Sequence, residues 1–288
     1  MSDPRPPRAP AKLGVLDVRA RKGGPKLAMV TAYDYPTARL AEAAGMDLLL
    51  VGDSLGMVVL GYATTVPVTL EEVVYHAKAV VRGAPNTHVV ADLPFLTYQI
   101  SDAQAIESGG RLLKEAGVDA VKLEGGEAMA DRVRALVRAG IPVVGHVGLT
   151  PQSAGSLGGF RVQGRELEPA LAILGDAEAV VAAGAYALVI EAVPRELAAL
   201  IGERVAVPTI GIGAGPDCDG QVLVAHDLLG LEERIAPRFA KRYADLAAAT
   251  REAFAAYAAE VRDGVFPDAG HSFAMKPEVV AALRRAAG

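Results

Sequence analysis

Eight short apolar runs recur along the chain, and their spacing constrains the fold more than any other feature of the sequence. The runs are rich in aliphatic residues and do not alternate with polar ones, which is typical of parallel strands covered on both faces. Helical patterns fill most of the intervals, so the order of elements predicts a (β/α)8 barrel, the TIM-barrel fold. The predicted strands cover residues 27–34, 46–54, 88–95, 119–126, 141–149, 186–194, 207–215 and 221–228.

Start and stop signals locate several of the predicted helices. The segments Thr69–Glu72 and Ser101–Gln104 both have the spacing of a capping box, and a helical pattern ends at Gly140, where a C-terminal cap is expected. Only residues 216–220 separate the seventh and eighth runs, which is too short for a normal helical crossover. We therefore expect a single turn there instead of a helix.

The C-terminal part of the chain predicts helices beyond the barrel. Residues 238–264 form an alanine-rich helical pattern and residues 276–288 a final one, with an apolar face that could cover the barrel or contact another subunit. No linker or shift in composition indicates a second domain. We expect one domain over residues 1–288, in which residues 1–12 form a flexible arm and the C-terminal helices lie within 238–288.

Charge and composition exclude several classes of function. The net charge is −5 and no basic block occurs, so nucleic-acid binding is not expected. Cys218 is the only cysteine, which excludes an intrachain disulfide framework and a thiolate metal cluster. No apolar run approaches the roughly 20 residues that span a bilayer, and no signal-peptide pattern begins the chain. We therefore expect a cytoplasmic protein that does not bind membranes.

Polar residues stand at the ends of the predicted strands. In (β/α)8 barrels the carboxyl ends of the strands meet at one rim, where the chemistry takes place. The residues at those ends are Tyr33-Asp34, Asp53-Ser54, Asp92, Lys122 with Glu124, His146, Glu191, Gly213–Gly215 and His226-Asp227.

Three of these acids predict a metal site. Asp53, Asp92 and Glu124 would repel one another strongly in a partly desolvated mouth, and a divalent cation relieves that repulsion. Their oxygen ligands suit Mg²⁺. The alternative is that the acids cap helices, since aspartate is common at strand-to-helix turns.

Lys122 and Glu191 complete the predicted chemistry. Lys122 lies two residues before Glu124, so both side chains point to the same face of the strand, and a cation there suits a substrate carboxylate. It could instead pair with Glu124 alone. Glu191 follows four apolar residues, where burial raises the pKa of a carboxyl and makes it a plausible base, unless an arginine pairs with it.

The remaining strand-end residues carry weaker signals. His146 could bind substrate, ligate the metal or be structural. For His226 and Asp227 we expect a structural role. The glycines at 213–215 could approach a phosphate or a flat ring, but they do not form a dinucleotide-binding motif. Cys218 lies beside them in the sequence, and we expect it to be a small packing residue.

These residues lie in sequence blocks that resemble the ketopantoate hydroxymethyltransferase family. The similar blocks are VGDSLGMVVLGYATTVPVTLEEVVYH, ADLPF, VKLEGG, GHVGLTPQS, GGFRVQG, VIEAVP, IGIGAGPDCDGQVLVAHDLLG, FAKRY and GVFPDAGHSF. They appear in order from about residue 28 to beyond residue 243, whereas the N-terminal arm and the last helix carry little of the family's signal.

The resemblance implies a homo-oligomeric barrel of the phosphoenolpyruvate/pyruvate type, a decamer in the family, that uses Mg²⁺ and 5,10-methylenetetrahydrofolate. It assigns Asp53, Asp92 and Glu124 to the metal, and Asp53, Ser54, Asp92 and Lys122 to the ketoacid substrate. Glu191 is implied as the proton acceptor. The reaction implied is hydroxymethyl transfer to 3-methyl-2-oxobutanoate through a Mg²⁺-stabilised enolate, giving 2-dehydropantoate for pantothenate and coenzyme A synthesis.

Two other functions share part of this pattern. A Mg²⁺-dependent 2-oxoacid C–C lyase of the same barrel type would use the same acids, so only the wider blocks favour the transferase. The second alternative is a non-catalytic barrel that serves as a binding or scaffold protein. Such a protein need not retain all five of the predicted active-site residues, so their presence together argues against it; they are Asp53, Asp92, Lys122, Glu124 and Glu191.

Overall fold

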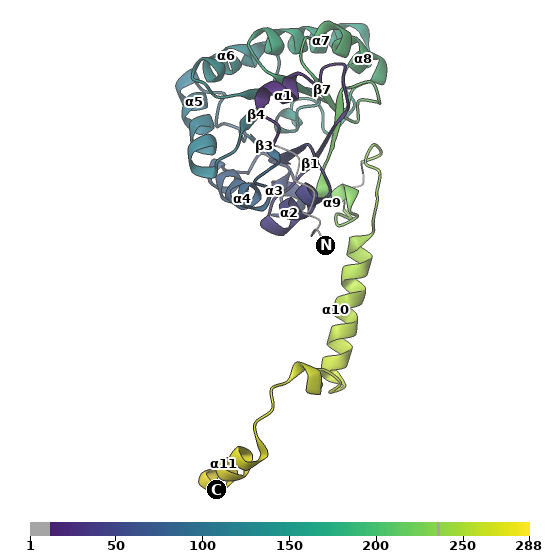
Figure 1. The fold of residues 1–288 in the computed structure, drawn as a ribbon. Coiled ribbons are helices and arrows are strands. Elements are labelled where there is room, and N and C mark those ends of the chain that lie inside the picture. The colour runs from purple at the N-terminus through teal and green to yellow at the C-terminus, as the bar shows by residue number, and fades with distance from the viewer. Residues whose placement is uncertain (1–11, 235–236) are drawn as a thin grey trace, which may run out of the picture.

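The computed structural model describes residues 12–234 and 237–288, so the predicted N-terminal arm lies outside the described residues except for Lys12. Eight parallel strands form a closed barrel in chain order, and β1 pairs with β8 to close it (Figure 1). The predicted (β/α)8 fold is therefore confirmed. The strands are β1 (Leu27–Thr31), β2 (Leu48–Val51), β3 (His88–Asp92), β4 (Ala120–Glu124), β5 (Val143–Gly148), β6 (Ala187–Glu191), β7 (Thr209–Ile212) and β8 (Gly220–Leu223).

Helices surround most of the barrel. Thr69 begins α4 with a complete capping box: Thr69 N donates to Glu72 Oε2 at 2.7 Å and Glu72 N donates to Thr69 Oγ1 at 3.2 Å. Ser101 caps α5 by accepting from Gln104 N at 3.2 Å, but Gln104 does not return the bond to Ser101, because its Oε1 accepts from Ile100 N instead. The helices of the ring are α2 (Tyr35–Ala43), α3 (Leu55–Val58), α4 (Leu70–Gly83), α5 (Asp102–Arg111), its π-helical continuation η1 (Leu112–Ala116), α6 (Ala130–Arg138), α7 (Leu167–Ala182) and α8 (Arg195–Arg204). The 3-10 turns η2 (Glu127–Met129) and η3 (Pro151–Ser153) follow β4 and β5.

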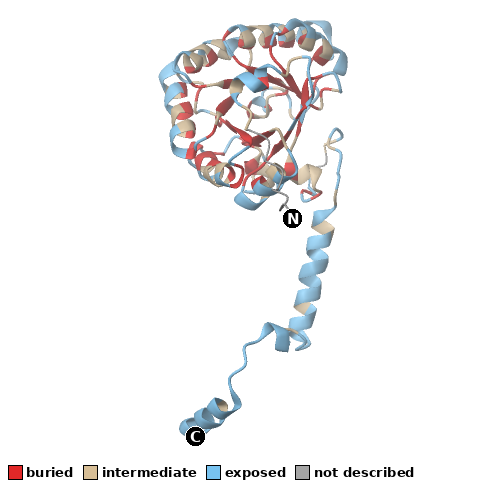
Figure 2. Ribbon diagram, in the orientation of Figure 1, coloured by how far each residue is buried: buried red, intermediate tan, exposed pale blue. Residues whose placement is uncertain are grey.

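Alternate residues of each strand belong to two separate cores. On β2, Leu49 and Val51 pack outward against the helices, whereas Leu48 and Leu50 pack inside the barrel. Figure 2 shows the buried strands at the centre of the ring of helices. This alternation decides which side chains of every strand face the barrel axis.

The amino end of the barrel is closed by α1 (Val15–Arg19). Val18 is fully buried and belongs to the inner core together with Leu27 and Leu48, the first residues of β1 and β2. The carboxyl end is thus the end through which the interior can be reached.

The region around β8 differs in part from the sequence prediction. The segment between β7 and β8 contains no helix, as expected, and turns through Gly213 and Gly215, both at positive φ. The eighth strand is shorter than predicted, because it ends at Leu223 and the chain then forms the one-turn helix α9 (Ala225–Leu228). His226 and Asp227 therefore lie on α9 and not at a strand end.

The C-terminal helices project away from the barrel (Figure 1). The helix predicted over residues 238–264 is α10 (Leu246–Arg262); it begins later because Asp245 caps it, accepting from Ala248 N at 3.3 Å. A 3-10 turn, η4 (Ala269–His271), and the predicted final helix, α11 (Pro277–Ala287), follow. Figure 2 shows that this segment is exposed along its length, so the apolar face of α10 does not cover its own barrel. Among the described residues, no helix has the length and hydropathy required to span a membrane.

Candidate active site

Strand alternation brings the predicted site residues to the carboxyl-end mouth of the barrel. Val90 of β3 and Ala120 of β4 lie in the inner core, so the residues two and four positions later also face the axis. The residues that reach the mouth in this way are Asp92, Lys122, Glu124, His146 and Glu191.

Asp53 and Ser54 join them from the turn after β2. The backbone N–H of Asp53 donates to Asp92 Oδ2 at 3.0 Å, which fixes the turn against β3. A β-carbon at Gly52 would lie 2.8 Å from Ser54 Oγ, so a larger residue there would displace the Ser54 hydroxyl. The Ser54 hydroxyl is held by Tyr33, whose hydroxyl oxygen lies 2.8 Å from Ser54 Oγ.

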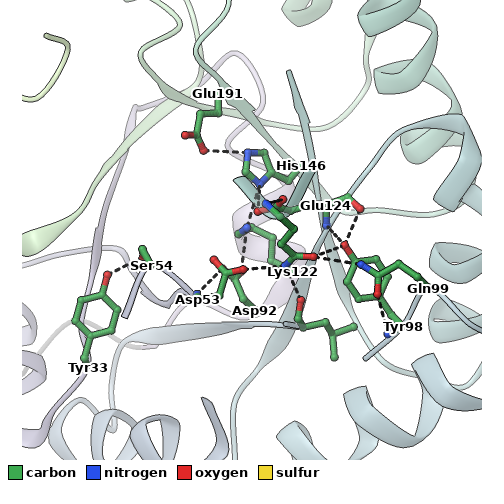
Figure 3. A network of polar contacts seen from close by, with 12 residues as sticks. Tyr33, Asp53, Ser54, Asp92, Tyr98, Gln99, Lys122, Glu124, His146 and Glu191 are labelled. Carbon is green, nitrogen blue, oxygen red and sulfur yellow. Dashed lines mark hydrogen bonds and ion pairs between the residues drawn. The ribbon is translucent and has the colours of Figure 1, made fainter. Parts of the chain in front are cut away.

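Lys122 is the buried cation of the site. Its Nζ lies 3.0 Å from Asp92 Oδ1, so the ion pair joins it to Asp92 and not to Glu124 (Figure 3). Burial lowers the pKa of Lys122, but the charges of Asp92, Glu124 and Asp53 outweigh this effect and raise it. Burial, Glu124 and Asp92 together raise the pKa of Asp53 well above its ordinary value, and burial also raises that of Asp92. One lysine therefore does not compensate for the buried acids.

His146 connects the two glutamates of the mouth. Its Nδ1 lies 3.1 Å from Lys122 Nζ and 3.5 Å from Glu124 Oε1, and its Nε2 lies 3.1 Å from Glu191 Oε2. Burial and Lys122 lower the pKa of His146, but the two glutamates outweigh them and raise it to about 9. For Glu124, burial raises the pKa and the contacts with His146, Lys122 and Gln152 lower it below its usual range. Within the described residues, the ion-pair partner of Glu191 is this histidine and not an arginine.

Gln152 is a buried site residue that the sequence did not reveal. Its Nε2 donates to Asp53 Oδ2 at 2.9 Å, and its backbone N–H donates to Glu124 Oε2 at 2.9 Å. Its Oε1 accepts from the hydroxyl of Tyr98 at 2.8 Å. Gln152 lies in η3. No local sequence pattern predicts that a glutamine in a turn after a strand donates hydrogen bonds to two carboxylates.

One cavity of about 470 Å³ joins these groups. All of the predicted catalytic, substrate and metal residues line it: Asp53, Ser54, Asp92, Lys122, Glu124, His146 and Glu191. His226 instead packs its ring against Tyr33, with the ring centroids 5.6 Å apart, and Cys218 is buried beside β7 as a packing residue.

The chemistry of these donors fits a hard cation, although they do not form a finished ligand set. Asp53 and Asp92 are adjacent buried carboxylates with raised pKa values, so a positive charge between them would relieve their repulsion. Glu124 already accepts a hydrogen bond from the backbone N–H of Gln152. In the part of the chain that is described, no three His, Cys, Asp or Glu side chains are arranged to hold one metal ion.

The sequence matches a known family over most of its length. A family model described as ketopantoate hydroxymethyltransferase matches residues 12–269. A 3-methyl-2-oxobutanoate hydroxymethyltransferase of Moorella thermoacetica is 62% identical over 253 residues, which cover 88% of this chain and 94% of that protein. A protein of the same name from Thermus thermophilus is 60% identical over 259 residues, covering 90% of this chain and 98% of its own.

Solved structures with a similar fold are far more distant in sequence. A phosphoenolpyruvate phosphomutase from Streptomyces platensis subsp. rosaceus has a TM-score of 0.60 at 18% identity and covers 88% of each chain. A phosphonopyruvate hydrolase in complex with oxalate and Mg²⁺ has a TM-score of 0.59 at 15% identity and covers 96% of this chain and 98% of its own. At this level of identity the similarity concerns the fold alone.

Proposed function

Because the chain belongs to the ketopantoate hydroxymethyltransferase family, we propose that it transfers a hydroxymethyl group from 5,10-methylenetetrahydrofolate to 3-methyl-2-oxobutanoate. The product is 2-dehydropantoate, a precursor of pantothenate and coenzyme A. The observation that carries the proposal is the buried mouth in which Lys122, three acids and the His146–Glu191 pair line one cavity.

Lys122 and Ser54 bind the carboxylate of the ketoacid. The pKa of Lys122 is raised by its acidic neighbours, so the ammonium stays charged and can hold an anion in a buried site. The Ser54 hydroxyl, positioned by Tyr33, supplies a neutral donor beside it. Lys122 is buried and Ser54 is half-buried, and this limited access to solvent favours a small anionic substrate over water.

Asp53 and Asp92, with Glu124 beside them, would hold Mg²⁺. Mg²⁺ is usually bound through one or two carboxylates together with substrate oxygens and water, which suits the adjacent pair Asp53 and Asp92. When bound, the ion would supply Lewis-acid chemistry that draws electron density from a 2-oxoacid and so favours loss of the proton next to its ketone. Gln152 keeps both Asp53 and Glu124 in place for this role.

Glu191 takes the proton. Its carboxylate removes the proton on C3 of the ketoacid, and the electron pair of that C–H bond moves into the enolate. His146, 3.1 Å from Glu191 Oε2, orients the carboxylate and stabilises its charge. The methylene carbon of the folate is bonded to two nitrogens. The enolate carbon forms a C–C bond to it as one C–N bond breaks, and water then forms the C–O bond of the hydroxymethyl group as the second C–N bond breaks. The proton taken by Glu191 and the remaining proton of the water end on the two folate nitrogens.

We further propose that the protein is a homo-oligomer in which α10 packs on another copy. The helix buries none of its residues on its own barrel, although Phe254, Tyr257 and Val261 are large and apolar. A cytoplasmic location remains the expectation.

Proton exchange tests the proposed function directly. The C3 proton of 3-methyl-2-oxobutanoate is followed by NMR in D₂O with Mg²⁺, for the parent enzyme and Glu191→Gln. Loss of a general base slows such a step by about 10²–10⁴-fold, and we expect a loss of that size. Glu196→Gln, at an exposed glutamate on α8 that pairs with Arg195, serves as the matched control and should exchange normally.

Two outcomes would contradict the proposal. Undiminished exchange in Glu191→Gln would show that Glu191 is not the base. Rapid exchange in metal-free protein would show that proton removal does not need the metal. Addition of 5,10-methylenetetrahydrofolate should then give 2-dehydropantoate, whereas a C–C lyase would show no dependence on the folate.

A further inference from the structure

Tyr98 is a buried tyrosine behind the active-site cavity. It lies in the segment between β3 and α5, is 1% exposed, and packs its ring into the core between the strands and the helices. Neither Tyr98 nor Gln152 is among the described residues that line the cavity. Both side chains can therefore affect a bound substrate or metal only through the residues that they hold in place.

The hydroxyl of Tyr98 connects two segments of the site. Its oxygen lies 2.8 Å from Gln152 Oε1 and 2.9 Å from the backbone oxygen of Glu124, and it accepts from Glu124 N at 3.2 Å (Figure 3). A phenol has a single proton, which these two acceptors share, and the Gln152 amide is the nearer of them. Since Glu124 ends β4 and Gln152 lies in η3 after β5, one hydroxyl holds the two segments together.

Both ends of the Gln152 side-chain amide favour the same orientation. Its Nε2 donates to Asp53 Oδ2 and to the backbone oxygen of Leu93, each at 2.9 Å. Its Oε1 accepts from the hydroxyl of Tyr98 and, at 3.3 Å, from Gln99 Nε2. A flipped amide would place its oxygen beside a carboxylate and a carbonyl, which are both acceptors and would repel it.

Tyr98 is the stronger of the two donors to the amide oxygen. Its bond is the shorter one and its side chain is buried, whereas Gln99 is half-buried. A hydroxyl that donates to an amide oxygen also polarises the amide, which strengthens the bonds that the amide nitrogen donates. Tyr98 therefore supports the bond from Gln152 to Asp53 in two ways: it anchors the amide and makes its nitrogen a better donor.

Resting on the proposed function, in which Asp53 helps to hold Mg²⁺, we propose that Tyr98 is a positioning residue of the metal site. It holds the Gln152 amide on Oδ2 of Asp53, which leaves Oδ1 of that carboxylate available to the cation. Without the hydroxyl, only the longer bond from Gln99 would anchor the amide oxygen. The carboxylate would then adopt the metal-binding arrangement less often, and the affinity for the metal falls with the population of that arrangement.

Mn²⁺ binding without substrate tests this role, because it needs no assay of activity. Tyr98→Phe keeps the buried ring and removes the hydroxyl alone. Loss of one neutral hydrogen bond changes an equilibrium by about 2–10-fold, so Tyr98→Phe should weaken Mn²⁺ binding by that factor in a titration followed by electron paramagnetic resonance. If Tyr98 acts through Gln152, the double variant Tyr98→Phe with Gln152→Leu should bind Mn²⁺ no more weakly than Gln152→Leu alone. Excess Mg²⁺ should restore proton exchange at C3 in Tyr98→Phe to the parent rate.

Tyr186→Phe is the matched control, since it also removes the hydroxyl of a buried tyrosine but at a residue that bonds His88. It should bind Mn²⁺ as the parent does, although it also loses a buried hydrogen bond. Equal Mn²⁺ affinity in Tyr98→Phe and the parent, or a further loss in the double variant, would overturn the assignment. An equal loss in Tyr186→Phe, or exchange that stays slow at saturating Mg²⁺, would also overturn it. A parent protein that does not bind Mn²⁺ would instead overturn the proposed metal site, and this inference with it.

Discussion

The two ends of the barrel bury polar groups in opposite ways. At the carboxyl end, burial and neighbouring acids raise the pKa of Asp53, and the single ammonium of Lys122 does not offset them. At the amino end, His88 is buried with both ring nitrogens bonded, Nδ1 to Leu13 O at 2.9 Å and Nε2 to the hydroxyl of Tyr186 at 2.8 Å. Both side chains are buried, but only His88 at the amino end has a hydrogen-bond partner for each of its polar atoms. The negative charge of Asp53 at the carboxyl end is left without full compensation.

Asp219 illustrates the amino-end pattern. Its carboxylate accepts from Gly23 N at 2.8 Å and Thr209 N at 2.9 Å, and it lies 3.2 Å from Lys22 Nζ. Burial raises the pKa of Asp219, but these donors outweigh it and lower the pKa below its ordinary value. In such barrels residues at the carboxyl end carry out the chemistry and residues at the amino end contribute stability. Asp53 and Asp219 follow that division.

The largest expected effect separates activity from stability at the carboxyl end. Asp53→Asn should lower kcat by at least about 10³-fold, because a charge that holds the cation and substrate is lost. The metal-free variant should nevertheless be more stable than the parent by about 1–2 kcal/mol, because one buried negative charge is removed. Urea denaturation in EDTA measures this difference. A destabilised variant would contradict the view that Asp53 is poorly compensated.

A smaller effect is expected at Gln152, which positions two of these carboxylates. Gln152→Leu removes the donor to Asp53 Oδ2 and should weaken Mn²⁺ binding by about 10–100-fold, as for other partners of metal ligands. Titration followed by electron paramagnetic resonance measures the affinity without an activity assay. Gln99→Leu is the control: the Gln99 side chain donates to Gln152 Oε1 at 3.3 Å and accepts from Tyr98 N at 3.4 Å, but among the described residues it bonds neither Asp53 nor Glu124. Equal affinities in the two variants would show that Gln152 does not position the site.

The strand ends were predictable from sequence because strand geometry is local. A two-residue period places Lys122 and Glu124 on the same side of β4, and both line the cavity. The acid after the buried run of β2 likewise reaches the mouth. Eight apolar runs, most of them separated by helical patterns, were sufficient to predict the barrel itself.

Contacts between distant segments were not predictable in this way. Gln152 meets Asp53 across 99 positions of sequence, and His88 meets Tyr186 across 98. Neither pair has a periodicity that a single sequence displays. The start of α10 was placed too early because helix-forming residues continue upstream of Asp245, and only the cap shows where the helix begins.

At the amino end the expected effect falls on stability alone. In Asp219→Asn, a side-chain NH₂ would face groups that are all donors, so the variant should be less stable by about 1–3 kcal/mol while kcat stays unchanged. Because the folded-state pKa of Asp219 is lowered, its contribution is complete above the unfolded pKa and is lost as the pH falls through the folded one. The difference should thus be full at pH 7 and shrink below about pH 4. Asp217→Asn, at an exposed neighbour, is the control for thermal unfolding at both pH values.

The smallest expected effect tests whether the two ends are independent. Tyr186→Phe removes the hydroxyl that bonds His88 Nε2 but leaves the ring in the inner core, so unfolding should become easier by about 1 kcal/mol. Tyr75→Phe, at a residue that is 74% exposed, should change nothing. Kinetics and C3 proton exchange should match the parent enzyme in both variants, because Tyr186 does not line the active-site cavity. A drop in exchange with Tyr186→Phe would mean that packing inside the barrel transmits strain from α1 to the buried acids, and the division between a stabilising end and a catalytic end would then fail.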